Sequence, residues 1–297
     1  MKIAVLTAPA KVNLSLFLGP LRDDGRHELV TLFQTVSLAD SLAVSDSRSS
    51  RDEVLCAGVR GPNLVVDALA GLRAAGWKAP PVRVDIVKRI PVAAGMGGGS
   101  ADAAALLRYA PTLAVVSDQA VAQLAAQLGA DVPSRLHPGA VLGTGAGDVL
   151  SPAPALAEHA LLVLPQDFGL STADVYREAD RLGLPRAASE LDRLRTGLED
   201  WLAEPSQRPP ESLIVNDLQP AALSLRPQIE AALEVVREVG AHQALVCGSG
   251  PTVIGVFWGP TAVVHARAAA EGLRARYPRV RAVEPVRGGV EPPAANS

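Results

Sequence analysis

Four glycines lie within five positions of the segment PVAAGMGGGSADAA, residues 91–104. The segment follows VRVDIVK, whose alternation predicts a strand, and its end overlaps a run of high helix propensity, residues 100–107. Backbone N–H groups without side chains at a helix start can approach a phosphate closely and favour its negative charge. These residue types and their spacing favour a phosphate-binding loop, with a glycine-rich packing turn as the alternative.

Two common phosphate-binding loops do not fit this segment. A P-loop requires a lysine after its last glycine, whereas Ser100 follows Gly99 here. The dinucleotide fingerprint needs glycine at position 100 and an acidic residue at the end of the next strand, and the sequence predicts no such strand. Ser100 could cap the helix or offer its hydroxyl to a phosphate or a metal ion.

A second group of candidate residues lies near the N-terminus, in AKVNLSLFL. Apolar residues alternate there with polar ones, so the pattern predicts a strand with Lys11 and Asn13 side by side on one face. The chain has four lysines and 24 arginines, which suggests that this position needs a compact ammonium group, although an exposed lysine is the alternative. Asp131, in GADVP, is either a turn residue before Pro133 or a carboxylate that does chemistry.

The composition excludes several classes of protein. A length of 297 residues with 48% hydrophobic residues indicates two domains with cores, and a net charge of −3 with 3% aromatic residues argues against nucleic-acid binding. Two cysteines and scattered histidines form neither a disulfide framework nor a zinc site. The apolar run at residues 3–6 is too short for a signal peptide, and no run reaches the ~20 residues of a membrane span. We therefore expect a cytoplasmic protein without a membrane partner, and the sequence indicates no protein partner.

The order of the predicted elements indicates two halves that meet in SPAPALAEH, which places a domain boundary between residues 152 and 153. In the first half, strand patterns lie in 10–18, 26–44 and 82–88, and helical patterns in 63–75, 100–107 and 118–128. In the second half we expect a strand at 160–164, helices up to 201 and at 227–239, strands at 243–247 and 252–258, a helix at 261–276 and a strand at 280–286. Without the helices up to 201, this order is β-α-β-β-α-β. Residues 289–297 are expected to be a disordered tail.

The segment PxxxGMGGGSADAA resembles the phosphate loop of the GHMP kinases, the superfamily of galactokinase, homoserine kinase and mevalonate kinase. The resemblance implies ATP as the phosphoryl donor together with Mg²⁺. It also implies an α+β fold of two domains, a ribosomal-protein-like α/β domain at 1–152 and a ferredoxin-like βαββαβ domain at 153–288. The β-α-β-β-α-β order agrees with the second of these domains.

Further segments point to one branch of this superfamily, and the resemblance extends from residue 8 to about residue 286. APAKVNLSLFL, DDGRHELVTLFQTVSL, LGADVP, IVNDL and CGSGPTVIGVF resemble the branch whose small-molecule substrate carries a cytidine diphosphate group. A homoserine- or mevalonate-type kinase and a non-catalytic nucleotide-binding module remain the alternatives.

The resemblance also assigns roles to individual residues. Asp131 is expected to be the catalytic base, and Lys11 its electrostatic partner beside the acceptor hydroxyl. Ser100 is the first candidate ligand for Mg²⁺. The residues expected to bind ATP are Lys88 and Asn63, near the adenosine, and the loop residues Pro91, Val92, Ala93, Ala94, Gly95, Met96, Gly97, Gly98, Gly99, Ser100 and Ala101.

The remaining predicted contacts are with the substrate, and His27 is expected near its cytosine end. Arg26 stands where the family commonly has tyrosine, so its guanidinium plane could replace an aromatic ring stacked on cytosine. The alternatives are a surface position for His27, a helix cap for Thr172, a solvated strand-end charge for Lys88 and a simple hairpin turn for the loop at residues 248–251. The residues expected to bind the substrate are Asn13, Arg26, His27, Thr172, Gly248, Ser249 and Gly250.

Overall fold

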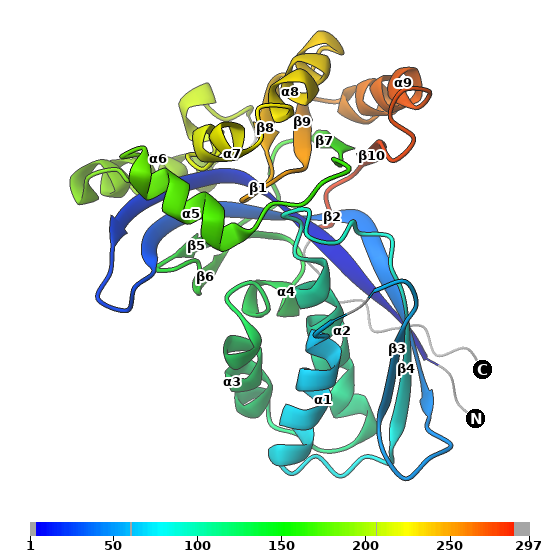
Figure 1. Cartoon of the computed structure of the whole chain (residues 1–297). Coiled ribbons are helices and arrows are strands. Elements are labelled where there is room, and N and C mark those ends of the chain that lie inside the picture. The colour runs from blue at the N-terminus through cyan, green and yellow to red at the C-terminus, as the bar shows by residue number, and fades with distance from the viewer. Residues whose placement is uncertain (1–3, 60, 206, 288–297) are drawn as a thin grey trace.

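The computed structural model describes residues 4–59, 61–205 and 207–287, so the predicted tail at 289–297 lies outside the described residues (Figure 1). In the first half, strands follow strands and helices follow helices over several elements, whereas the strands of the second half are separated mainly by helices. The strands are β1 (Ala4–Leu21), β2 (His27–Asp46), β3 (Glu53–Cys56), β4 (Val82–Val87), β5 (Ala140–Thr144), β6 (Val149–Pro152), β7 (His159–Leu164), β8 (Gln243–Val246), β9 (Val253–Trp258) and β10 (Arg281–Val283). The helices are α1 (Leu64–Ala74), α2 (Gly98–Leu113), α3 (Asp118–Leu128), α4 (Pro133–Leu136), α5 (Thr172–Arg181), α6 (Ala188–Ala203), α7 (Gln219–Leu225), α8 (Ile229–Glu238) and α9 (Ala262–Leu273), with a 3₁₀ turn at Glu211–Leu213.

The first sheet is organised by two long antiparallel strands, β1 and β2, which run through the centre of Figure 1. The strand order is β3-β4-β2-β5-β6, and β1 pairs with β2 outside this path. One part of β2 pairs with β4 and another part with β5, so this strand joins both wings of the sheet. The helices α1 to α4 lie together on one side of the long strands, with α2 packed against β1 and β2.

The second sheet has the strand order β10-β7-β9-β8, and all three of its pairings are antiparallel. Apart from the helical elements between β7 and α8, the chain passes β7, α8, β8, β9, α9 and β10. The last strand, β10, pairs with the first, β7, and β9 lies between β7 and β8. This is the ferredoxin-like arrangement, and it confirms the predicted α+β fold. Along β7, Leu161 and Val163 face the core of the first half, while Leu162 and Leu164 pack beneath α8 and α9.

Several element boundaries differ from those that the sequence patterns predict. The helix expected from residue 100 begins at Gly98 and continues to Leu113, because the last two glycines of the loop adopt helical backbone angles. The helix α7 was not predicted, because its seven residues begin with a Gln-Pro pair that resembles a loop. The patterns also miss β3, β5, β6 and α4, each of five residues or fewer, which are too short for a periodic signal. No helix in the described part of the chain is both long enough and apolar enough to cross a membrane.

Candidate active site

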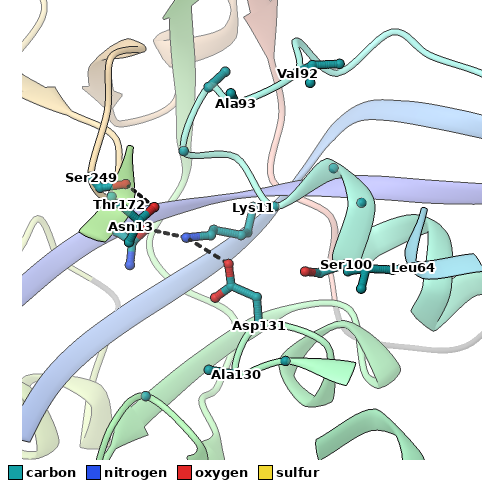
Figure 2. A pocket seen from close by; sticks show the side chains of 18 of the residues that line it. Lys11, Asn13, Leu64, Val92, Ala93, Ser100, Ala130, Asp131, Thr172 and Ser249 are labelled. Carbon is teal, nitrogen blue, oxygen red and sulfur yellow. Dashed lines mark hydrogen bonds and ion pairs between the residues drawn. The ribbon is translucent and has the colours of Figure 1, made fainter. Parts of the chain in front are cut away.

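A cavity of about 620 Å³ lies where the first sheet, the glycine-rich loop and the second half meet. Its wall includes β1 and β2, the loop from Pro91 to Ser100, the GAD segment at 129–131, the start of α5 and the loop between β8 and β9. Figure 2 shows that side chains of β1, the GAD segment, the start of α5 and the loop between β8 and β9 lie around one space, with Lys11 and Asp131 facing each other. The volume is within the range of cofactor and substrate sites.

The glycine-rich loop lies close to two other segments, and its glycines make this possible. Gly95 has a φ of +75°, and a Cβ atom placed on it would lie 2.2 Å from the backbone oxygen of Cys247. Gly97 precedes α2 in the left-handed conformation, at φ 66°. The backbone N–H of Lys11 donates a hydrogen bond to the oxygen of Met96 at 3.1 Å. The loop is therefore held against β1 with the N-terminus of α2 at the cavity wall, a geometry suited to phosphate.

Lys11 is buried and its ammonium group is shared between two neighbours. The Nζ atom donates to Asn13 Oδ1 at 2.8 Å and lies 3.7 Å from Asp131 Oδ2. Asn13 in turn donates to Thr31 Oγ1 at 2.8 Å, and this hydroxyl donates to the oxygen of Ser15. The period of two in β1 places Lys11 and Asn13 on one face, as the sequence predicts. The network fixes the position of the Lys11 ammonium at the cavity.

Asp131 follows α3 and opens into the cavity, with 37% of its side chain exposed. Burial alone would raise the pKa of this carboxyl, but neighbouring positive charge, foremost that of Lys11, holds the pKa below its ordinary value. A Cβ atom on Gly97 would lie 3.5 Å from both Asp131 Oδ2 and Lys11 Cγ. An ionised carboxylate, an ammonium group and the phosphate loop therefore meet at one point.

Lys88 and Asn63 line the same cavity, but each already has a role in the fold. Lys88 Nζ donates to Asp40 Oδ2 and, at 2.7 Å, to Asp102 Oδ2. Burial alone would lower the pKa of Lys88, but these carboxylates raise it above its ordinary value. Asn63 caps α1, since its Oδ1 accepts from the N–H of Val65 at 2.9 Å. The ammonium of Lys88 is therefore largely committed to two carboxylates.

The loop between β8 and β9 closes the cavity beside Lys11. A Cβ atom on Gly248 would lie 3.2 Å from Asn13 Oδ1 and 3.5 Å from Lys11 Nζ. The hydroxyl of Ser249 lies 2.9 Å from that of Thr172, so the loop also contacts the first residue of α5. Gly248, Ser249 and Thr172 line the cavity. Gly250 follows in the same loop but is not part of the lining.

Arg26 and His27 lie outside the cavity lining. Arg26 is exposed, and its guanidinium pairs with Asp24 at 2.9 Å and with Asp148 at 3.1 Å. His27 is buried beneath the surface, between the backbone oxygen of Gly19 and the carboxylate of Asp180. The ring centroid of His27 lies 5.8 Å from that of Tyr176, and Tyr176 does line the cavity. The aromatic surface at this end of the cavity therefore comes from α5.

Sequence reasoning missed several residues of the cavity wall. Thr31 and Phe33 occupy the face of β2 opposite the apolar one, and β2 pairs with the strand that carries Lys11 and Asn13. The alternation of Thr31 with apolar residues could have revealed it, whereas Phe33 is itself apolar and gives no such signal. Tyr176 and Asp102 lie on helices, where no local pattern distinguishes them. Finding these two required the fold.

Comparisons with known proteins agree with this geometry. The GHMP kinase N-terminal domain model matches residues 63–137, and the GHMP kinase C-terminal model matches residues 193–277. A 4-diphosphocytidyl-2-C-methyl-D-erythritol kinase of Arthrobacter sp. (strain FB24) is 38% identical over 290 residues, covering 90% of this chain and 86% of the relative. A kinase of the same name from Rhodococcus jostii (strain RHA1) is 41% identical over 267 residues, covering 84% and 82%.

Solved structures give the same result. A crystal structure of a 4-(cytidine 5'-diphospho)-2C-methyl-D-erythritol kinase has a TM-score of 0.76 at 35% identity, covering 96% of this chain and 100% of the other. A homoserine kinase from Cytophaga hutchinsonii, with a TM-score of 0.69 at 18% identity over 97% and 96% of the two chains, shares the fold. With relatives this similar over nearly the whole length, the chain belongs to the 4-diphosphocytidyl-2-C-methyl-D-erythritol kinase family of the ATP-dependent GHMP small-molecule kinases.

Proposed function

We propose that the chain transfers the γ-phosphoryl group of ATP to the 2-hydroxyl of 4-diphosphocytidyl-2-C-methyl-D-erythritol. The family supports this substrate. The observation that carries the reaction is the pair of Lys11 and Asp131, 3.7 Å apart, beside the position that a Cβ atom on Gly97 would occupy. The product is the 2-phosphate, and the reaction is a step of the non-mevalonate route to isoprenoid precursors. The relatives at 38–41% identity favour this substrate over homoserine or mevalonate.

Each of the two charged residues has one task in this mechanism. Asp131, ionised at neutral pH, accepts the proton of the attacking hydroxyl as a new bond forms between its oxygen and the γ-phosphorus. The bond from the γ-phosphorus to the bridging oxygen breaks, and ADP leaves. Lys11 stabilises the negative charge that develops on the attacking oxygen. The backbone N–H groups of residues 95–100, which include the start of α2, face the phosphates of ATP.

Mg²⁺ fits this cavity as an ion held mainly by ATP, and it would neutralise phosphate charge. The Oδ1 atom of Asp102 is buried without a hydrogen-bond partner among the described residues, and Asp102 lines the cavity together with Ser100. The Ser100 hydroxyl and this carboxylate oxygen would hold the ion. No cluster of three acidic, histidine or cysteine side chains suited to a metal occurs in the described part of the chain, which agrees with a site completed by phosphates and water.

The nucleotide and the cytidine end of the substrate then occupy opposite ends of the cavity. We place the adenosine near Asn63 and Lys88, beside the start of α1, and the cytidine near Thr172 and Tyr176. Tyr176 offers an aromatic face there, and His27 lies behind it. Arg26 would reach a bound cytosine only by leaving its two ion pairs. The domain boundary at 152/153 stays part of this proposal, supported by the end of β6 at Pro152 and the start of β7 at His159.

The test is ADP release by the purified protein with ATP, Mg²⁺ and the cytidine diphosphate substrate, beside homoserine and mevalonate. Turnover of the cytidine compound alone is the expected result. Turnover of another alcohol in its place would overturn the substrate. Tight ATP binding without turnover of any alcohol would favour a non-catalytic nucleotide-binding module instead.

A further inference from the structure

Arg135, in α4, carries a buried guanidinium group that has no hydrogen-bond partner in the described part of the chain. The residue is 2% exposed, and none of its three side-chain nitrogens donates to an acceptor. Leaving a buried charge uncompensated is costly, so buried arginines are normally paired with an acid. The placement of this cation therefore needs a reason beyond packing.

The surroundings of Arg135 place its charge beside the active site. The guanidinium carbon lies 5.7 Å from the centroid of the Phe33 ring, and the Nζ atom of Lys11 lies 5.3 Å from the same centroid. One aromatic ring thus contacts both cations. Asp131 precedes Arg135 by four residues and is the carboxylate whose charge acts on it. Arg108, which donates to the backbone oxygen of Arg135, adds repulsion rather than compensation.

We propose that Arg135 is a positioning residue that keeps Asp131 ionised from behind the cavity wall, so that two cations maintain the charge of the base. This inference rests on the proposed role of Asp131. Arg135 does not line the cavity and cannot contact a substrate there. Lys11 does line the cavity, and during the reaction its ammonium group interacts with the attacking oxygen as well as with Asp131. Arg135, as the second cation, then keeps the carboxylate of Asp131 ionised while the charge of Lys11 is shared between Asp131 and the attacking oxygen.

Among the described residues, the groups whose charge acts on Asp131 or that feel its charge are Lys11 on β1, Arg135 on α4, Tyr176 on α5 and Cys247 after β8. Burial raises the pKa of Tyr176 to about 12 and also raises the pKa of the Cys247 thiol. Both groups are therefore neutral near pH 7. Arg135 remains protonated, although burial lowers its pKa to about 10. The balance at Asp131 near pH 7 is decided by Lys11 and Arg135.

The test compares Arg135→Met, which removes the charge at similar volume, with Arg135→Lys, which keeps it. The pKa of Asp131 is measured by carboxyl ¹³C chemical shift, with the Asp131 signal identified by its loss in Asp131→Asn. We expect the pKa of Asp131 to rise by about one unit or more in Arg135→Met and to stay near the wild-type value in Arg135→Lys. The acid limb of kcat/KM should move with it. An unchanged pKa in Arg135→Met would overturn the proposal.

Two further results keep the inference separate from folding and from the proposed function. If Arg135→Met does not fold, the same titration in Lys11→Met decides: Asp131 should remain ionised at pH 7 with Arg135 alone, and a protonated Asp131 there would contradict the proposal. Full turnover by Asp131→Asn would remove Asp131 as the base. The measured effect of Arg135 on the carboxyl pKa would still stand, so the two failures are distinguishable.

Discussion

Two lysines flank the phosphate loop, each beside aspartate carboxylates, yet the two regions differ in how tightly they are closed. A Cβ atom on Gly97 would lie 3.5 Å from Lys11 Cγ, and one on Gly98 would lie 3.2 Å from Lys88 Nζ. Lys11 lies 3.7 Å from the carboxylate of Asp131, which opens into the cavity. Lys88 is enclosed between two carboxylates whose side chains are 0% and 5% exposed.

This difference separates a cation available to a ligand from one that holds the fold together. Two of the three donors of Lys88 go to Asp40 and Asp102, and Asp40 also accepts from the N–H groups of Arg89 and Ile90. The cluster joins β2, the start of the loop and the first part of α2. Among the described residues, Lys11 Nζ makes one hydrogen bond, to Asn13, and its other donors remain for substrate oxygens. The residue types are the same, and the number of partners sets the role.

The largest effect should follow from Lys88→Met. This change leaves two buried carboxylates without their cation, and breaking a buried pair in this way costs about 3–5 kcal/mol of the free energy of unfolding. Urea unfolding of wild type and variant measures it. The matched control is Lys78→Met, because Lys78 is exposed and should change stability by less than about 0.5 kcal/mol. Equal stability of both variants would mean that Lys88 is not structural.

The opposite pattern, a large loss of activity with a smaller loss of stability, is expected at Lys11 and Asp131, which we call the open site. Asp131→Asn removes the base while keeping its shape, and Lys11→Met removes the cation; each should lower kcat by at least ~100-fold, about 2.7 kcal/mol of barrier. Neither should lower the free energy of unfolding as much as Lys88→Met. Steady-state kinetics beside urea unfolding checks both statements. A Lys11→Met variant with wild-type kcat would show that Lys11 is not catalytic, although it faces the cavity and has few hydrogen-bond partners.

The loop between the two lysines gives a third test. Gly95→Ala would place Cβ against the oxygen of Cys247 at a positive φ, so the loop must move, and we expect a loss of about 2 kcal/mol and a higher KM for ATP. Gly99→Ala is the control, since the nearest atom to its Cβ would be 3.8 Å away, in Leu64. It should leave the free energy of unfolding nearly unchanged. Equal effects of the two variants would mean that loop position does not matter.

The contrast between the lysines also marks how far the sequence could predict the site. Period-two alternation placed Lys11 beside Asn13, and the glycine spacing indicated the phosphate loop, because both signals are local. The partners of Lys88 could not be found this way. Asp40 reaches it only through the register in which Ser41 pairs with Val87, and Asp102 only through the turn of α2. Ion pairs between distant segments depend on strand register, which no local pattern contains.

The smallest effect concerns Asp102, whose pKa burial raises to about 7 although Lys88 opposes the rise. The ordinary pKa of 3.8 applies to the unfolded chain, so protonation of this group favours folding. Its contribution is complete below pH ~4 and is lost as the pH rises through 7. Asp102→Asn lacks this dependence, so relative to wild type it should be about 1.4 kcal/mol more favourable at pH 8 than at pH 6. Urea unfolding at both values, without ATP or Mg²⁺, measures the difference. If the stability of Asp102→Asn relative to wild type is the same at both pH values, Asp102 does not take up a proton in this pH range. Asp102 would then be ionised beside Lys88, as Asp131 is beside Lys11.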